Sequence, residues 1–130
     1  MEIINLIDVK NCLYFIDNEN QILLSEENFD DIDSSHVVIN NEASLEVGIL
    51  NINLEELDNT NMVSVNPATS ALKLIEKDKI VKHIDRKNYL TISYPIIATK
   101  KDLFQHLLLN DFSWDLEIFV KKNSFKIINF

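Results

Sequence analysis

The residue types that most often carry out chemistry are few in this chain and widely separated. The three histidines, His36, His83 and His106, stand 47 and 23 residues apart, and none has a partner at a standard metal-ligand spacing. We therefore predict no metal site, an exposed His36 and a His106 on the surface of a helix. Cys12 is the only cysteine, and without a visible base it is predicted to be a small buried residue rather than a nucleophile.

Two short segments partly match known motifs. Ser70 and Lys73 have the SxxK spacing of serine acyltransferases, but the KTG and SDN elements of those enzymes are absent. Residues 17–21 space oxygen-bearing side chains as a calcium loop does, but Ile22 and Asn28 stand where that loop needs glycine and glutamate. We interpret Ser70 and Lys73 as helix residues and the acidic segment as a hairpin turn.

The glycine content excludes several classes of phosphate-binding enzyme. Gly48 is the only glycine, whereas a Walker A loop, a dinucleotide-binding turn, a kinase loop and a GxSxG elbow each need at least two within a short window. No set of nucleophile, base and oxyanion donors can be identified either. The sequence therefore predicts no cofactor and no enzyme activity, and an enzyme is only the third alternative.

The elements that would position these residues are predicted from apolar spacing and turn residues. Alternating apolar residues indicate strands, and apolar residues three and four apart indicate helices. Asn66-Pro67 and the segment from Thr99 to Asp102 have the residues typical of helix starts. Strands are predicted over 13–16, 21–24, 37–39, 45–49, 90–96, 114–120 and 125–130, and helices over 67–77 and 100–110.

These elements predict a single domain over residues 1–130 of the α+β class. We expect a mainly antiparallel sheet built from hairpins, with two helices packed on one face. Pro95 predicts that its strand lies at an edge or ends there, because proline cannot donate to a sheet ladder. With one glycine and 16 asparagines, turn positions of positive φ should fall mainly to asparagine.

The charges are distributed unevenly along the chain. Residues 1–72 contain 14 acidic residues and 1 basic residue, a net charge of −13, and residues 73–130 contain 7 acidic and 11 basic residues, a net charge of +4. Such an excess keeps a small protein soluble, which is the simpler explanation. The alternative is a binding face, with two apolar residues as anchors among the acids. The predicted partner-binding residues are Glu26, Glu27, Phe29, Asp30, Asp31, Ile32, Asp33, Glu55, Glu56 and Asp58.

A one-sided acidic face would attract a basic protein and repel nucleic acid. In length, acidity and α+β pattern, the chain resembles small bacterial immunity proteins as a group. The resemblance implies an immunity protein or antitoxin, more often a monomer than a dimer, that covers the active surface of a basic toxin or nuclease.

A second resemblance is to the chaperones of type III secretion. It lies in the segment Cys12-Leu13-Tyr14-Phe15-Ile16-Asp17, which leads into a hairpin. This alternative implies a dimeric escort protein that binds an unfolded segment in a salt-tolerant way.

The first residues lack a basic segment, and their apolar stretch is too short for a signal sequence or a membrane span. One cysteine gives no reason for an oxidising compartment. We therefore expect a cytoplasmic protein with no membrane partner.

Overall fold

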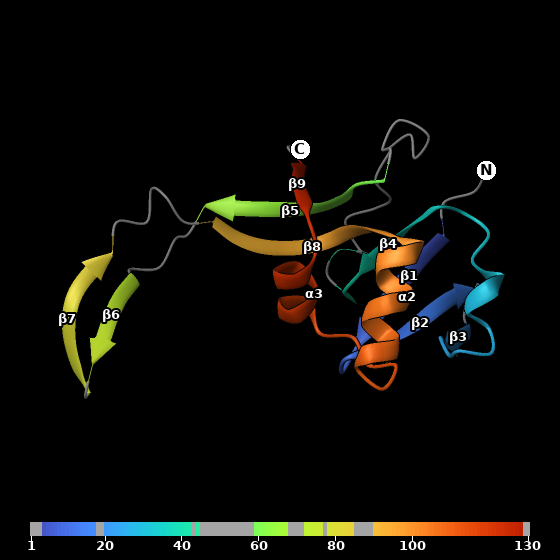
Figure 1. Cartoon of the computed structure of the whole chain (residues 1–130), viewed down its shortest axis with the longest axis horizontal. Coiled ribbons are helices and arrows are strands. Elements are labelled where there is room, and N and C mark those ends of the chain that lie inside the picture. Colours follow the sequence, from blue (N-terminus) through green and yellow to red (C-terminus); the bar gives the residue numbers. More distant parts are fainter. Residues whose placement is uncertain are drawn as a thin grey trace.

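The computed structural model describes residues 4–17, 20–42, 44, 59–67, 72–76, 78–84 and 90–128. A seven-stranded sheet of order β3-β2-β1-β4-β8-β5-β9 forms its centre, and a two-stranded sheet of β6 and β7 lies away from it (Figure 1). The strands are β1 (Ile4–Val9), β2 (Cys12–Asp17), β3 (Asn20–Leu23), β4 (His36–Asn40), β5 (Asn61–Pro67), β6 (Leu72–Glu76), β7 (Lys79–Ile84), β8 (Leu90–Thr99) and β9 (Phe125–Ile128). The helices are η1 (Phe29–Asp31), a single 3-10 turn, α2 (Lys100–Leu109) and α3 (Leu116–Lys122).

The large sheet is mixed, so the prediction of a mainly antiparallel α+β sheet is wrong. β1 pairs with β4 in parallel, and β5 pairs with β9 in parallel. The other pairs in this sheet, β1–β2, β2–β3, β4–β8 and β5–β8, are antiparallel. A hairpin is visible in a sequence because its turn lies between its strands, whereas a parallel pair joins strands that are distant in the chain.

The first three strands form two consecutive hairpins. The predicted hairpin of 13–16 and 21–24 is confirmed as β2 and β3. The hairpin of β1 and β2 was not predicted; Lys10 and Asn11 form its two-residue turn, with φ of 51° and 67°, as a type I′ turn requires. The other described residues with positive φ are Asp78, Asp111 and Phe112. The expectation that asparagine would supply most such positions is therefore wrong for the described residues.

The predicted helix over 67–77 is wrong. Pro67 ends β5, and Leu72–Glu76 is the strand β6, which pairs with β7 across a turn at Asp78. Four apolar residues at helical spacing gave too short a pattern to outweigh this pairing.

The predicted strand over 114–120 is also wrong, so it cannot form a hairpin with the strand predicted over 125–130. This region forms α3, whose N-cap Asp115 accepts the Ile118 N–H through Oδ1 at 3.1 Å. Leu116, Phe119 and Val120 have helical spacing as well as partial alternation, and Phe119 is the residue that becomes fully buried. β9 then pairs with β5 instead of folding back on its neighbour.

The predicted strand over 90–96 is confirmed as part of β8, but β8 lies in the interior of the sheet, between β4 and β5. The pairing with β5 moves from Val63↔Ile96 to Ser64↔Ser93, so Tyr94 and Pro95 form a bulge. A bulge accepts proline because the residue has no ladder bond to donate there.

The main core lies between the sheet and the two helices, which Figure 1 shows on one side of it. All five residues of β4 are buried, as expected for a strand in the middle of a sheet. The predicted strand over 37–39 is confirmed, and β1 and β8 occupy its two edges. The next strand predicted along the chain, 45–49, lies outside the described residues. Trp114, which is 1 % exposed, belongs to this core.

Candidate functional site

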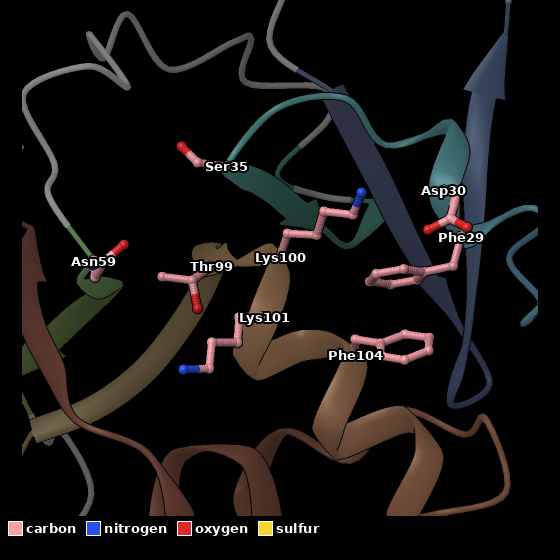
Figure 2. Close-up of a pocket in the computed structure, with 8 residues that line it drawn as sticks. All are labelled: Phe29, Asp30, Ser35, Asn59, Thr99, Lys100, Lys101 and Phe104. Atoms are coloured by element: carbon pink, nitrogen blue, oxygen red, sulfur yellow. The ribbon is translucent and has the colours of Figure 1, made fainter.

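A pocket of about 360 Å³ lies at the start of α2. It is bounded by η1, by the segments that precede β4 and β5, and by the end of β8 (Figure 2). We call it the α2 pocket, and its lining residues are Phe29, Asp30, Ser35, Asn59, Thr99, Lys100, Lys101 and Phe104.

Hydrogen bonds to the first turn of α2 hold this side of the pocket. Thr99 Oγ1 accepts the Asp102 N–H at 3.2 Å, so the N-cap predicted from the sequence is confirmed. The Lys100 N–H donates to Ser35 O at 2.8 Å. The Thr99 N–H donates at 2.8 Å to Oδ1 of the buried Asn61, whose amide nitrogen donates to Asp102 Oδ2 at 2.7 Å. These bonds join the start of α2 to the end of β8 and to the starts of β4 and β5.

Aromatic rings form the apolar wall of the α2 pocket. The ring centroids of Phe29 and Phe104 are 4.6 Å apart, and Phe112 packs edge-on against both. Phe29 and Ile32 are 2 % and 0 % exposed, so they cannot serve as the surface anchors that the sequence suggested. The 3-10 turn directs them inward while Asp30, Asp31 and Asp33 stay exposed.

Two lysines bring positive charge to the α2 pocket. Lys100 is partly committed to the fold, because its Nζ donates to Ile32 O at 2.6 Å and lies 5.7 Å from the Phe29 ring centroid. Lys101 is exposed and makes no hydrogen bond or ion pair within the described part of the chain. Figure 2 shows its ammonium group well apart from Asp30. Among the described lining residues, Lys101 is therefore the lysine that the fold does not use.

The predicted acidic face is only partly in the described structure. Glu26, Glu27 and the three aspartates of residues 30–33 are exposed, and Asp30 alone among them lines the α2 pocket. Glu55, Glu56 and Asp58 lie outside the described residues. Partner binding by these acids stays a prediction.

The predictions for His36 and His106 are wrong, because both rings are buried, at 1 % and 5 % exposed. His36 Nδ1 lies 2.8 Å from Ser35 Oγ, and its Nε2 has no hydrogen-bond partner among the described residues. His106 lies between α2 and α3, where it contacts the rings of Trp114 and Phe119. His36 precedes a run of apolar residues, the one sequence signal that pointed to burial. No cluster of metal-binding side chains occurs in the described part of the chain.

A hydrogen-bonded group of Tyr94, Asp8 and Trp114 joins the sheet to the segment before α3. Tyr94 Oη donates to Asp8 Oδ2 at 2.7 Å and accepts the Trp114 Nε1–H at 3.0 Å. Burial raises the pKa of Tyr94 well above its usual range, and the Asp8 carboxylate adds to this effect. Tyr94 is therefore a neutral structural group at physiological pH.

The α2 pocket lies at the amino ends of β4 and β5, whereas open α/β sheets usually bind ligands at the carboxyl ends of their strands. After β1, that edge has the tight turn at Lys10 and Asn11. After β4, Asn40 Nδ2 donates to Asn5 Oδ1 and Leu6 O, and Ser44 Oγ donates to Asn40 Oδ1, all at 3.2 Å. These polar groups already have partners in the described part of the carboxyl edge.

No helix in the described part of the chain is long and apolar enough to cross a membrane. No protein-family model matches this chain, and no curated protein sequence does.

Solved structures do match. One is 2-C-methyl-D-erythritol 4-phosphate cytidylyltransferase from Thermus thermophilus, at 12 % identity and a TM-score of 0.51, over 80 % of this chain and 56 % of that one. Another is 4-diphosphocytidyl-2C-methyl-D-erythritol synthase from Anaerococcus prevotii, at 17 % identity and a TM-score of 0.50, over 78 % and 53 %. This chain therefore spans about half the length of these structures.

These similarities contradict the function predicted from composition. Both of these structures are enzymes whose names refer to cytidylyl compounds, and neither is an immunity protein, an antitoxin or a secretion chaperone. The prediction that the chain is not an enzyme is contradicted by the same finding. Length and acidity are shared by many unrelated folds, so they could not distinguish these classes. At these identities the similarity establishes the fold alone: the chain folds like part of these two enzymes.

Proposed function

We propose that this protein binds a phosphorylated small molecule, a nucleotide or a sugar phosphate, in the α2 pocket. The observation that carries the proposal is a cavity of about 360 Å³ whose lining combines two lysines, a serine and a threonine with two phenylalanines. This volume lies in the range of small-molecule sites, and most such sites combine an apolar wall with a few polar groups.

The lining suggests how such a ligand would lie. The phosphate would bind beside Lys101 and the Thr99 hydroxyl, because an ammonium group and a helix start both favour negative charge. A base or another apolar part would pack on Phe104. The exposed Asp30 carboxylate would accept hydrogen bonds from ligand hydroxyl groups, as acidic residues do for ribose in dinucleotide sites.

The proposal is tested by calorimetric titration with CMP, CTP and glycerol 3-phosphate. At least one of them should bind, and Lys101→Met should weaken that binding about tenfold or more, since a charge-assisted hydrogen bond is lost. Lys126→Met is the matched control, because Lys126 is an exposed lysine on β9, away from the pocket. Equal affinity in both variants, or no binding of any of the three ligands, would overturn the proposal.

A second candidate function is cytidylyl transfer itself, and the fold similarity supports it. In that reaction the phosphate of the acceptor attacks the α-phosphorus of CTP, the bond to the β-phosphate breaks and pyrophosphate leaves. Pyrophosphate release from CTP and 2-C-methyl-D-erythritol 4-phosphate is the measurement. Release that Lys101→Met lowers would support transfer at this pocket, whereas binding without release would limit the function to binding. The cytoplasmic location stays a prediction.

A further inference from the structure

A second pocket, of about 280 Å³, lies between α2 and the end of α3. It faces away from the α2 pocket, because its α2 residues lie on the opposite side of that helix from Lys100, Lys101 and Phe104. We call it the His106 pocket, and its lining residues are Asp102, Gln105, His106, Leu109, Asn110, Lys122 and Asn123.

The hydrogen bonds of His106 determine which of its ring nitrogens carries the proton. The backbone N–H of Asp115 donates to His106 Nε2 at 3.1 Å. A backbone N–H can only donate, so Nε2 must keep its lone pair. The neutral ring therefore carries its hydrogen on Nδ1, because neutral imidazole has one donor and one acceptor nitrogen.

The Nδ1–H group then has no acceptor within the described structure. The polar atom that lies beside it is Asn110 Nδ2, at 3.4 Å. This atom is itself a donor, because it donates to the His106 carbonyl oxygen at 2.7 Å, a bond that fixes the orientation of the amide. Two donors face each other, and the imidazole is only 5 % exposed. A buried donor without an acceptor is costly unless something else supplies one.

The charges around the pocket favour an anion as that acceptor. Lys122 in the last turn of α3 lines the pocket and lies close enough to affect the titration of His106. The Asp102 carboxylate is the one acidic group among the described lining residues, and its Oδ2 already accepts from Asn61. The third charged group near the ring, Asp115, caps α3 through Oδ1 and does not line the pocket. Asn123 and Gln105 add amide groups that can donate.

We propose that the His106 pocket is a binding site for a small oxyanion, a carboxylate or a phosphate group, one of whose oxygens accepts the His106 Nδ1–H beside the Lys122 ammonium. The site is separate from the α2 pocket and does not depend on the function proposed there. It explains why a buried imidazole faces a polar cavity with its donor unused.

The experiment is a nitrogen-15 NMR titration of the histidine rings at pH 7, with inorganic phosphate and, separately, with acetate. In the free protein His106 should be the Nδ1–H tautomer. Either anion should shift its ring signals in a saturable way, and the pKa of His106 should rise with the anion bound, because a nearby negative charge stabilises imidazolium. Saturation by phosphate alone indicates a phosphate site, and saturation by acetate alone indicates a carboxylate site.

Lys122→Gln should weaken anion binding about tenfold, since it removes the charge-assisted contact. Lys121→Gln is the matched control, because it removes the same charge from the preceding, exposed residue of α3, which does not line the pocket. An Nε2–H tautomer, no saturable shift with either anion, or equal weakening by the two substitutions would overturn the proposal.

Discussion

The two pockets on α2 differ in how much of their polar lining the fold already uses. In the α2 pocket, Thr99, Ser35 and Lys100 are bonded to the backbone or to a neighbouring ring, and the exposed Lys101 is left over. In the His106 pocket, the unused group is the buried Nδ1–H of His106. The other ring nitrogen of His106 accepts the Asp115 N–H at the start of α3. A ligand would thus meet an exposed surface charge in one pocket and a fixed buried donor in the other.

This difference shows that the polar residues near a pocket are not equally available to a ligand. Most of them hold the helix in place, and the ones free to bind are found by following each hydrogen bond to its partner. The two pockets are therefore held by the same hydrogen bonds to α2 but offer different groups to a ligand. Substitutions that remove those shared bonds should affect both pockets.

The largest effect is expected from Leu107→Ala, which should affect both pockets. Leu107 is fully buried and packs in the core beneath α2. Its truncation should lower the free energy of unfolding by about 2–5 kcal/mol. Urea denaturation measures this loss, and Leu108→Ala is the control, because Leu108 is 47 % exposed on the same helix. Equal losses would mean that α2 does not rest on this core.

Asn61→Ala should have the next largest effect. Asn61 accepts the Thr99 N–H beside one pocket and donates to Asp102 beside the other, and it also donates to Ser124 O. Removing it leaves buried groups unpaired, which should lower the free energy of unfolding by about 3 kcal/mol. The ligands of both pockets should bind more weakly. If only one pocket were affected, the two would not share this support.

Thr99→Ala should affect mainly the α2 pocket. The substitution removes the N-cap acceptor of α2, which should cost about 1 kcal/mol of stability in a urea titration. It also removes a lining hydroxyl of the α2 pocket. Thr99→Ser should restore both properties, because serine keeps the oxygen. Loss of anion binding in the His106 pocket would contradict the separation of the two sites.

Acidification should affect the His106 pocket. Burial lowers the pKa of His106 below its usual 6.5, against the opposing effect of Asp115 and with a further lowering by Lys122. The unfolded chain then binds the proton more readily than the folded protein, so His106 should make stability fall as the pH drops below about 6.5.

Thermal unfolding of the wild type and His106→Gln, compared between pH 7.5 and 5.5, isolates this contribution. The wild type should lose more stability than the variant over this range. The same pH dependence in both proteins would mean that His106 does not stay neutral in the fold.

The sequence predicted those elements whose signals are local. The β2–β3 hairpin has its turn between its strands, and the N-cap of α2 is a bond between Thr99 and Asp102, which are three residues apart. The segment 114–120 was misread because its apolar residues satisfy both periods, and only the inward packing of Phe119 selects the helix. The segment 72–76 was misread because its pairing with β7 outweighs a weak helical pattern.

The candidate sites were harder to predict than the elements. The acidic residues drew attention because they are numerous, whereas the pocket depends on Lys101, Thr99 and Phe104, which are common residues in a common helix start. His106 was recognised as a residue of interest, but its burial follows from its packing against Trp114 and Phe119, and no spacing rule reveals that contact.

By itself, the sequence determined the β2–β3 hairpin, the strand β8, the start of α2 and the absence of glycine-rich phosphate loops, since each depends on neighbouring residues. The tertiary structure alone decided the parallel pairs β1–β4 and β5–β9 and the two pockets. It also decided the burial of Phe29, Ile32, His36 and His106. The physical reason is that these features join residues far apart in the chain, and the free energy of burial depends on which surfaces finally meet.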